Sequence, residues 1–263
     1  MSDYNVVKTK DGKLTDSFSQ AVSDPLPEIA LIDGDIIAYR AAFSTQDGLP
    51  EDALDKTDEL IENILQDVFF NPDRADYEVF LTGKGNFRYD VDETYKAHRK
   101  DTEKPIHLEL IRNHLIDQYG ANVSSGEEAD DVIAIRATEL YPNGVIVSVD
   151  KDFMQVPGIH FNPTKGEWVW VNDWAGLVFF YTQILTGDRA DNVVGLHRVG
   201  PVKAAKILEG SESEYDMYHR CVEAYDGDTD KVIRNAKLLW LRREVGQVWQ
   251  PPQEKEGDSE SQP

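Results

Sequence analysis

The chain has 263 residues, 40% of them hydrophobic, and a formal net charge of −22. A chain of this length and composition can bury a sizeable core, which excludes a fibrous or disordered protein and favours one large domain, with or without an appendage. The acidic balance argues against a protein that binds nucleic acid through an overall basic surface. Basic residues are nevertheless concentrated in two segments, residues 87–100 and 195–206.

Membrane and export signals are missing from the sequence. No stretch approaches the ~20 apolar residues of a membrane span. The N-terminal residues have neither the apolar centre of a signal peptide nor the Arg-rich character of a transit peptide. The single cysteine, Cys221, excludes an intramolecular disulfide and agrees with a reducing compartment, or is a core residue by chance. We therefore expect a cytoplasmic protein with no membrane partner.

The order of apolar segments predicts an α/β fold. Residues 1–27 and 251–263 are polar and are expected to be disordered tails. Between them, three apolar runs read as buried parallel strands, and helical patterns separate them. The strand segments are 28–35, 77–83 and 144–150, and the helical segments are 58–70, 105–120 and 127–141. This alternation predicts a central, mostly parallel sheet covered on both faces, with the site at the carboxyl ends of its strands.

The later part of the chain predicts a hairpin and then two helices. Residues 159–171 read as a hairpin with Lys165 and Gly166 in its turn. Residues 173–187 read as a helix closed by Gly187. The turn "GLHRVG" follows, and Pro201 then stands in the first turn of the next helix, the position that proline prefers.

Carboxylates are crowded at the ends of the apolar runs. Asp33 and Asp35 end the first strand, and Asp150 and Asp152 end a later one. Taken singly, each pair is explained at least as well by turn or cap chemistry. Because the carboxyl ends of parallel strands share one edge, the two pairs are expected to lie close together.

A third cluster, "EEADD", opens the helix predicted at residues 127–141. It contains Glu127, Glu128, Asp130 and Asp131, and neighbours three and four apart in it are expected to point the same way. The structural alternative is a capping box of Ser125 with Glu128, helped by the helix dipole. That alternative accounts for one or two of the four acids, because the effect of the dipole fades beyond the first turn.

Together with Asp188 and Asp191 of "GDRADN", these clusters can converge on one edge of one sheet. Crowded carboxylates repel one another unless a cation lies between them. Oxygen ligands without cysteine or nearby histidine suit Mg²⁺ or Mn²⁺ rather than zinc. Two such ions about 4 Å apart can hold the attacking water and the leaving oxygen of a phosphodiester in line. The sequence therefore predicts a pair of divalent metal ions.

The two basic segments are candidates for contacts with DNA. In the second segment, backbone amides at the turn and at the helix start can bind a phosphate, and Lys203 and Lys206 lie on one helix face. The alternative there is an ordinary helix hairpin with solvated lysines. In the first segment, Lys96 and Arg99 could close over a phosphate and Tyr95 could stack on a base; taken alone, this segment is a charged surface loop.

Five motifs in this order resemble the flap endonuclease family, which includes the 5′-nuclease domain of bacterial DNA polymerase I and the 5′-to-3′ exonucleases of tailed phages. They are "LIDGDIIAYRA", "YKAHRK", "EEADD", "VSVDKDF" and "LTGDRADNVVGLHRVGPVKAAKIL", and they span Ile29 to Leu208. The ending "NAKLLWLRREVGQVWQP" is similar to that of the phage exonucleases. The resemblance implies a PIN-like nuclease domain at residues 28–180, with a helical arch over its site, and a helix-three-turn-helix DNA-binding region within residues 181–250.

The resemblance also implies roles for individual residues. The first metal centre would contain Asp33, Glu128, Asp130 and Asp131, and the second would contain Asp150, Asp152, Asp188 and Asp191. Lys96 and Arg99 would contact the scissile phosphate, and Arg40 would serve the same region. The turn from Gly195 to Gly200 would also bind a monovalent cation such as K⁺ through its carbonyls. The residues expected to bind DNA are Arg88, Tyr95, Lys96, Arg99, Gly195, His197, Arg198, Gly200, Lys203 and Lys206.

One expected metal ligand is missing. The family usually has an aspartate just after the second strand, where this chain has Leu81 or Gly83, depending on the alignment. We hypothesise that Asp35 replaces it, because residues two apart on a strand share a face. The loss could also leave activity weak, or leave one metal that binds only with substrate.

These features predict a monomeric, metal-dependent 5′-to-3′ exonuclease with flap or primer-removing activity on DNA, encoded by a phage and so acting in the host cytoplasm. RNA–DNA hybrids are possible substrates, and a replication polymerase or a single-strand binding protein is a possible partner. One alternative is a nuclease fold that binds DNA without cleaving it. Another is a haloacid-dehalogenase-type phosphatase, since "DGD" after a strand and "GDRADN" resemble its motifs. Such a phosphatase has no use for "EEADD" or for the basic hairpin.

Overall fold

The protein is described by a computed structural model of residues 6–7, 27–69, 76–99 and 102–254. These residues form two compact units. Within the described ranges, unit 1 contains residues 6–7, 27–69, 76–87, 99, 102–176 and 241–247. Unit 2 contains residues 88–98, 177–240 and 248–254. No described helix is both long and apolar enough to cross a membrane.

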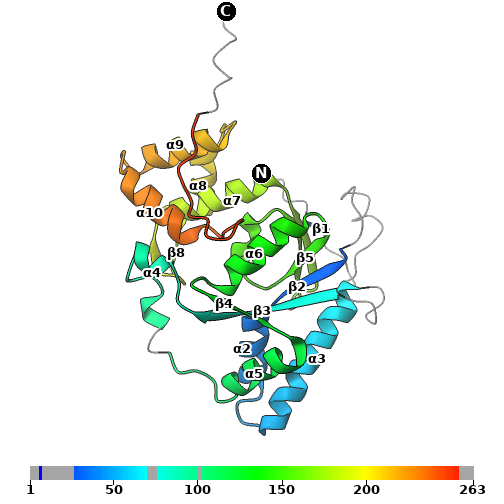
Figure 1. The fold of residues 1–263 in the computed structure, drawn as a ribbon. Coiled ribbons are helices and arrows are strands. Elements are labelled where there is room, and N and C mark those ends of the chain that lie inside the picture. The colour runs from blue at the N-terminus through cyan, green and yellow to red at the C-terminus, as the bar shows by residue number, and fades with distance from the viewer. Residues whose placement is uncertain (1–5, 8–26, 70–75, 100–101, 255–263) are drawn as a thin grey trace, which may run out of the picture. The chain divides into compact units, whose positions relative to one another are not determined.

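Unit 1 is built on a seven-stranded sheet with the order β1-β7-β6-β5-β2-β3-β4 (Figure 1). The five strands from β4 to β6 in this order run parallel, and β7 and β1 are antiparallel to their neighbours. The strands are β1 (Val6–Val7), β2 (Ile29–Asp33), β3 (Asp76–Lys84), β4 (Asn122–Ser125), β5 (Gly144–Val147), β6 (Gly158–Asn162) and β7 (Glu167–Val171). The predicted, mostly parallel sheet is therefore confirmed.

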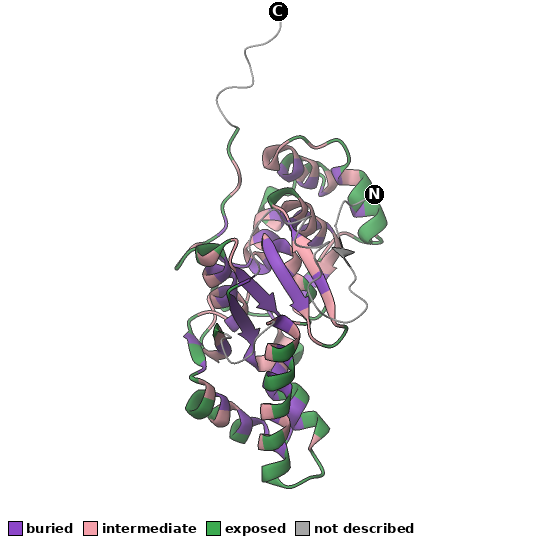
Figure 2. Ribbon diagram, turned by 90° about the vertical axis from the view of Figure 1, so that its right-hand side faces the viewer, coloured by how far each residue is buried: buried purple, intermediate pink, exposed green. Residues whose placement is uncertain are grey.

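Helices cover both faces of this sheet. On one face, α2 (Gly34–Ser44), α3 (Pro50–Val68) and α5 (Leu108–Tyr119) bury a cluster that includes Ile32 and Val145. On the other face, α6 (Ala129–Leu140) and the 3₁₀ helix η3 (Lys151–Gln155) bury a cluster with Leu31 and Ile146. Adjacent residues of each strand thus face opposite layers, which explains why the strands read as continuous apolar runs. Figure 2 shows these strands as largely buried.

Unit 2 has a core of its own. It contains α4 (Arg88–Val91), most of α7 (Asp173–Thr186), the strand pair β8 (Gly187–Asp188) and β9 (Val193–Val194), and the helices α8 (Pro201–Leu208), α9 (Glu214–Ala224) and α10 (Thr229–Leu239). Phe180, Tyr181 and Ile184 of α7 are fully buried and pack with residues of the later helices. Cys221 lies in this core, where burial raises the pKa of its thiol to about 12.

Several predicted boundaries differ from the structure. α3 begins at Pro50 rather than near residue 58, because proline fits the first turn and the Leu49 N–H donates to the Asp52 carboxylate at 2.7 Å. Val6 and Val7 form the edge strand β1, although a disordered tail was expected there; the remainder of residues 1–26 lies outside the described part. At the other end, residues 251–254 have no regular structure, and 255–263 are outside the description.

The segment expected to form a helical arch contains, among described residues, two short helices, α4 and η2 (Ala97–Arg99), and the arch itself stays a prediction. α4 ends early because Asp92 forms a turn: its carboxylate accepts hydrogen bonds from the Thr94 N–H at 2.8 Å and the Thr94 hydroxyl at 2.6 Å. The predicted hairpin is confirmed as β6 and β7, with Gly166 in the left-handed region at φ 62°.

Candidate functional site

Two carboxylates meet at the carboxyl edge of β2 and β5, which are neighbours in the sheet. Asp33 is the last residue of β2 and caps α2, where the Ile36 N–H donates to Asp33 Oδ1 at 3.2 Å. The Ser148 hydroxyl donates to Asp33 Oδ2 at 2.9 Å, and the Asp150 N–H donates to Ser148 Oγ at 3.0 Å. Ser148 therefore links the two strand ends. The prediction that Asp33 and Asp150 share one edge is confirmed.

Charge is crowded at this edge. Asp33 is only 4% exposed, and its pKa is raised to about 7, chiefly by burial and then by repulsion from Asp35 and, less strongly, from Asp150. The hydrogen bonds from Ser148 and Ile36 work in the opposite direction. A nearby cation would favour the ionised carboxylate, as predicted for these acids.

Asp35 is placed differently from the prediction. β2 ends at Asp33, so Asp35 lies in the first turn of α2 and does not share a strand face with Asp33. Its Oδ2 accepts the Thr82 N–H at 2.8 Å, and its Oδ1 accepts from Arg112 at 2.5 Å. Arg112 also donates to the Thr82 carbonyl at 2.6 Å. The geometric basis for Asp35 as a replacement ligand is therefore wrong, because β3 and Arg112 hold its carboxylate.

The two positions where the family's aspartate was expected both lie within β3 and are closely packed. Leu81 is fully buried in the core. At Gly83, an added Cβ would lie 2.0 Å from the Ser124 carbonyl oxygen, so no side chain fits without a backbone shift. Thr82 lies between them, and its hydroxyl accepts the Ala129 N–H at the start of α6 at 3.0 Å. A neutral residue thus contacts the start of α6 between the two positions where an acid was expected.

At the start of α6, the acids divide into different roles. The expected capping box of Ser125 with Glu128 is wrong, because β4 extends through Ser125 and Glu128 itself is the N-cap. The Glu128 N–H donates to Asp131 Oδ2 at 3.2 Å. Asp131 is fully buried, whereas its neighbours Glu128 and Asp130 are partly exposed. Its assignment as a metal ligand stays a prediction.

The pair Asp150 and Asp152 lies at η3. Asp150 caps this helix, and its Oδ1 accepts the Asp152 N–H at 2.8 Å. Lys151 forms an exposed ion pair with Asp152 at 3.0 Å. Across the described part of the chain, no three acidic, histidine or cysteine side chains are gathered closely enough to hold a metal ion. The edge therefore presents carboxylates without a closed set of ligands.

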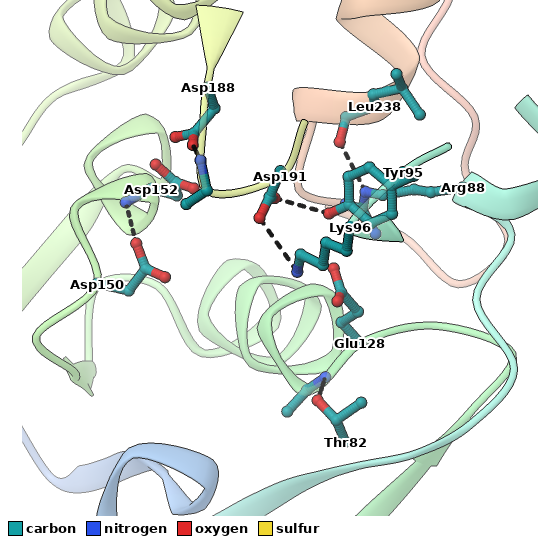
Figure 3. A network of polar contacts seen from close by, with 12 residues as sticks. Thr82, Arg88, Tyr95, Lys96, Glu128, Asp150, Asp152, Asp188, Asp191 and Leu238 are labelled. Atoms are coloured by element: carbon teal, nitrogen blue, oxygen red, sulfur yellow. Dashed lines mark hydrogen bonds and ion pairs between the residues drawn. The ribbon is translucent and has the colours of Figure 1, made fainter. Parts of the chain in front are cut away.

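In unit 2, Asp191 holds two residues of the first basic segment. The Tyr95 hydroxyl donates to Asp191 Oδ2 at 2.8 Å, and Lys96 Nζ lies 3.6 Å from Asp191 Oδ1 (Figure 3). Tyr95 is 2% exposed within the core of unit 2, so the expectation that it stacks on a base is wrong. Asp188 is buried and accepts the Ala190 N–H at 2.7 Å. The roles of Asp188 and Asp191 in a second metal centre stay predictions.

Arg88 is a structural residue rather than a DNA contact. It is 1% exposed and donates to the Leu238 carbonyl at 2.8 Å (Figure 3). It also donates to the Trp240 carbonyl at 2.8 Å. Arg99 lies at the end of η2 and is exposed. Arg40 lies on α2 and is also exposed. Their predicted contacts with the phosphate remain untested.

The second basic segment is exposed as predicted. His197, Arg198, Lys203 and Lys206 are all exposed, and Lys203 Nζ donates to the Arg198 carbonyl at 2.9 Å. The turn lines a cavity of about 330 Å³ that includes Gly195, His197 and Arg198. Gly195 is required by packing, since an added Cβ would lie 2.2 Å from the Thr186 carbonyl carbon. Gly200 is not, because an added Cβ there meets nothing within 4 Å.

Three side chains that organise the acidic edge were not singled out from the sequence: Thr82, Arg112 and Ser148. Ser148 stands two residues before Asp150, which is the only local signal among the three. Thr82 and Arg112 act on Asp35 over separations of 47 and 77 residues. No spacing rule along the chain reports such contacts.

Residues 28–167, which include every acid of this edge, match the family model of the 5′-3′ exonuclease N-terminal resolvase-like domain. The chain belongs to the 5′-3′ exonuclease family. The resemblance noted from the five motifs is thereby confirmed. No comparison supports a haloacid-dehalogenase phosphatase.

Relatives of this 5′-3′ exonuclease family member include flap endonucleases and DNA polymerases. Flap endonuclease Xni of Colwellia psychrerythraea is 30% identical over 233 residues, which cover 73% of this chain and 76% of the relative. Xni of Shewanella piezotolerans is 31% identical over 170 residues, 59% of this chain and 67% of the relative. DNA polymerase I of Thermus thermophilus is 28% identical over 214 residues, 71% of this chain, and the chain spans 24% of the polymerase.

Among solved structures, the T5 5′-exonuclease with bound zinc ions is similar to this 5′-3′ exonuclease family member, with a TM-score of 0.60 at 18% identity over 80% of this chain and 88% of the other. A T5 flap endonuclease complex with DNA and metal ions has a TM-score of 0.58 at 17% identity, over the same shares of the two chains. At these identities, the likeness shows the shared α/β nuclease fold.

Proposed function

We propose that this chain is a divalent-metal-dependent 5′-to-3′ exonuclease or flap endonuclease that hydrolyses phosphodiester bonds at the 5′ ends of DNA. The observation that carries the proposal is the edge where Asp33 and Asp150 are joined through Ser148 in a chain of the 5′-3′ exonuclease family. The names of two relatives as flap endonucleases support it.

The donor set at the edge suits a hard divalent cation by its chemistry. Its oxygens belong to carboxylates, and the mutual repulsion of Asp33, Asp35 and Asp150 is what a cation would relieve. The side chains that would hold the ion are Asp33, Glu128, Asp130, Asp150 and Asp152. When bound, such a cation lowers the pKa of a water and offsets charge on the phosphate.

The chain's own residues orient the carboxylates and neutralise charge on the phosphate. The Ser148 hydroxyl fixes the Asp33 carboxylate, and the Ile36 amide holds the other oxygen, so its lone pairs have set directions. Lys96 and Arg99 would contact the scissile phosphate, and Arg40 would serve the same region. The exposed cations of the Gly195–Gly200 turn and of α8 would grip the phosphate backbone of the duplex.

Finer assignments belong to the same proposal. They are Mg²⁺ or Mn²⁺ as the metal, two ions rather than one, K⁺ at the turn from Gly195 to Gly200, activity on RNA–DNA hybrids, a monomer, and a polymerase or single-strand binding protein as a partner. Each is tested by a metal-substitution, substrate or binding assay on the protein.

A labelled 5′-flap duplex, incubated with Mg²⁺ or with EDTA, tests the function. We expect shortened products only with the metal. Replacing both Asp150→Ala and Asp152→Ala should lower cleavage about 10³-fold or more, because the metal contributes several kcal/mol to the transition state. DNA binding, measured separately by gel shift, should survive. Cleavage that persists in EDTA, or in the double variant, would remove the assignment.

The same assay separates this function from DNA binding without cleavage. A gel shift with no product at any metal concentration would identify a non-catalytic homologue. The missing ligand at Gly83 is what makes that outcome worth testing.

A further inference from the structure

The segment Leu241–Gln247 follows α10 in the chain but belongs to unit 1. We call it the arginine strap, because Arg242 and Arg243 both lie in it; Arg242 is buried and Arg243 is partly buried. Arg242 is 8% exposed, and burial lowers the pKa of Arg243 to about 9. Burying a guanidinium is costly unless its partners compensate, so the contacts of the strap identify what it holds.

One set of contacts holds the end of η3. The Leu241 N–H donates to Gln155 Oε1 at 2.9 Å, and Arg243 Nη2 donates to the Gln155 carbonyl at 2.7 Å. Gln155 is 2% exposed and is the last residue of η3, the short helix that begins after Asp150 and contains Asp152. The strap therefore fixes the helix that presents these two carboxylates.

The other set holds the start of α6. The Arg242 N–H donates to Asp131 Oδ1 at 3.2 Å, and Arg242 Nη1 donates to Glu127 Oε2 at 2.8 Å. Its guanidinium carbon also lies 3.7 Å from the centroid of the Phe87 ring, a cation–π distance. Glu127 and Asp131 flank the two acids proposed as ligands on this helix, Glu128 and Asp130.

The strap thus spans two elements that are far apart in the sequence. Its bonds to η3 and α6 cross 86 and 115 residues. A metal site needs ligands from both elements within a few tenths of an ångström of one geometry. Partners outside the first coordination sphere commonly supply this alignment.

We propose that Arg242 is a positioning residue for the metal ligands of this chain. With Arg243, it sets the start of α6 against the end of η3, so that carboxylates from both elements reach one cation. This inference rests on the proposed function. It adds that metal binding at the edge depends on a distant segment of the chain, which contacts Gln155 of η3 across 86 residues.

Three variants test the role of Arg242. Arg242→Gln removes the ion pair with Glu127 and the contact with Phe87. Arg242→Lys keeps the charge and the reach to Glu127. Arg136→Gln is the matched control, because Arg136 lies on the same helix α6 and forms ion pairs with Glu78 at 2.9 Å and Glu139 at 3.0 Å, away from the edge.

The first measurement is amide hydrogen exchange of the metal-free protein. We expect Arg242→Gln to speed exchange about tenfold or more in peptides covering residues 127–132 and 150–156, because the loss of a buried partner releases the helix start. Arg136→Gln should leave both peptides unchanged. This readout does not depend on catalysis, so it holds even if the chain proves not to cleave DNA.

The second measurement separates positioning from folding. With a 5′-flap duplex, Arg242→Gln should lower kcat about tenfold or more and leave KM for DNA unchanged, and it should raise the Mn²⁺ concentration at half-saturation of binding about tenfold. Arg242→Lys should recover most of both losses. If Arg242→Gln does not fold, Glu127→Gln takes its place, since it leaves the buried guanidinium without its carboxylate and should show the same pattern.

Two results would overturn the proposal. One is unchanged Mn²⁺ binding and kcat in Arg242→Gln, with a loss of stability like that of Arg136→Gln, which would make the strap only structural. The other is unchanged exchange at both peptides. Wild-type protein that binds Mn²⁺ but cuts no DNA would instead count against the proposed function and leave the alignment itself measurable.

Discussion

The acidic edge of unit 1 and the basic turn of unit 2 differ in how their charged side chains are held. At the edge, each carboxylate has a defined partner: Ser148 for Asp33, Arg112 for Asp35, and the Arg242 amide for Asp131. In the turn and in α8, the charged side chains are exposed, and Lys203 of α8 donates to the nearby Arg198 carbonyl. Substitutions of the edge carboxylates and their partners should therefore cost folding stability, whereas substitutions of the exposed cations in the turn and α8 should cost affinity for DNA alone.

The largest expected effect tests whether the edge is closed to the missing ligand. Gly83→Asp should lower the free energy of unfolding by about 3 kcal/mol, because its Cβ would lie 2.0 Å from the Ser124 carbonyl oxygen. Gly83→Ala should lose nearly as much, since the Cβ alone causes the clash. Gly200→Ala in the turn, with nothing within 4 Å of the new Cβ, should stay near wild type. Denaturant unfolding measures all three.

A stable Gly83→Asp protein that binds Mn²⁺ more tightly would contradict the expectation that close packing excludes a side chain at Gly83. It would show that the backbone of β3 can yield and that the edge is open to a further acid.

The same contrast shows where sequence reasoning succeeds. The apolar runs of β2, β3 and β5 predicted the parallel sheet and hence the edge where Asp33 and Asp150 meet, because burial on both faces requires such runs. In the turn, exposed cations are read correctly from local sequence, since they depend on few distant partners. These are the parts of the fold and site that a short window can specify.

The failures have one physical cause, which is the partner far along the chain. Arg88 and Tyr95 stand in a charged segment and read as surface residues, yet Arg88 bonds to Leu238 over 150 residues and Tyr95 to Asp191 over 96. Asp35 is taken by Arg112, 77 residues away. Charge patterns locate such side chains but cannot report which buried group they meet.

The second prediction concerns acid stability and uses a buried histidine of unit 1. His160 is 4% exposed, and its Nε2 lies 2.8 Å from the Val156 carbonyl oxygen. Burial is the main reason that its pKa is lowered to about 4. As the pH falls from about 6.5 towards 4, the unfolded chain binds a proton at this histidine and the folded chain does not. The free energy of unfolding should therefore fall by about 3 kcal/mol in that pH range.

Matched glutamine variants isolate this histidine. His160→Gln keeps a donor for the Val156 carbonyl but does not titrate, so its unfolding free energy should change less between pH 7 and 4.5. His197→Gln, in the exposed turn, should keep the wild-type profile. Equal slopes for all three proteins would show that His160 does not set the acid limit.

The third prediction tests whether the lysines of α8, which follows the turn, contact DNA. Replacing both Lys203→Gln and Lys206→Gln should reduce the slope of log affinity for duplex DNA against log salt by about 2, because each phosphate contact adds about 0.9. Their exposure predicts unfolding free energies within about 0.5 kcal/mol of wild type. Lys56 is a partly exposed lysine of α3 that pairs with Glu59, and Lys56→Gln is the control for the loss of charge. An unchanged salt slope in the double variant would remove α8 from the DNA interface.

The smallest expected effect decides the role of Asp35. Because Thr82 and Arg112 hold both of its oxygens, Asp35→Asn should leave Mn²⁺ affinity unchanged and lower the free energy of unfolding by about 1 kcal/mol through the weakened contact with Arg112. Asp33→Asn, on the last residue of β2, should abolish Mn²⁺ binding under the same conditions. Isothermal titration with and without DNA measures both. If Asp35→Asn weakens binding as strongly as Asp33→Asn does, then Arg112 yields the carboxylate to the metal, and the contrast between a committed edge and an open turn no longer holds.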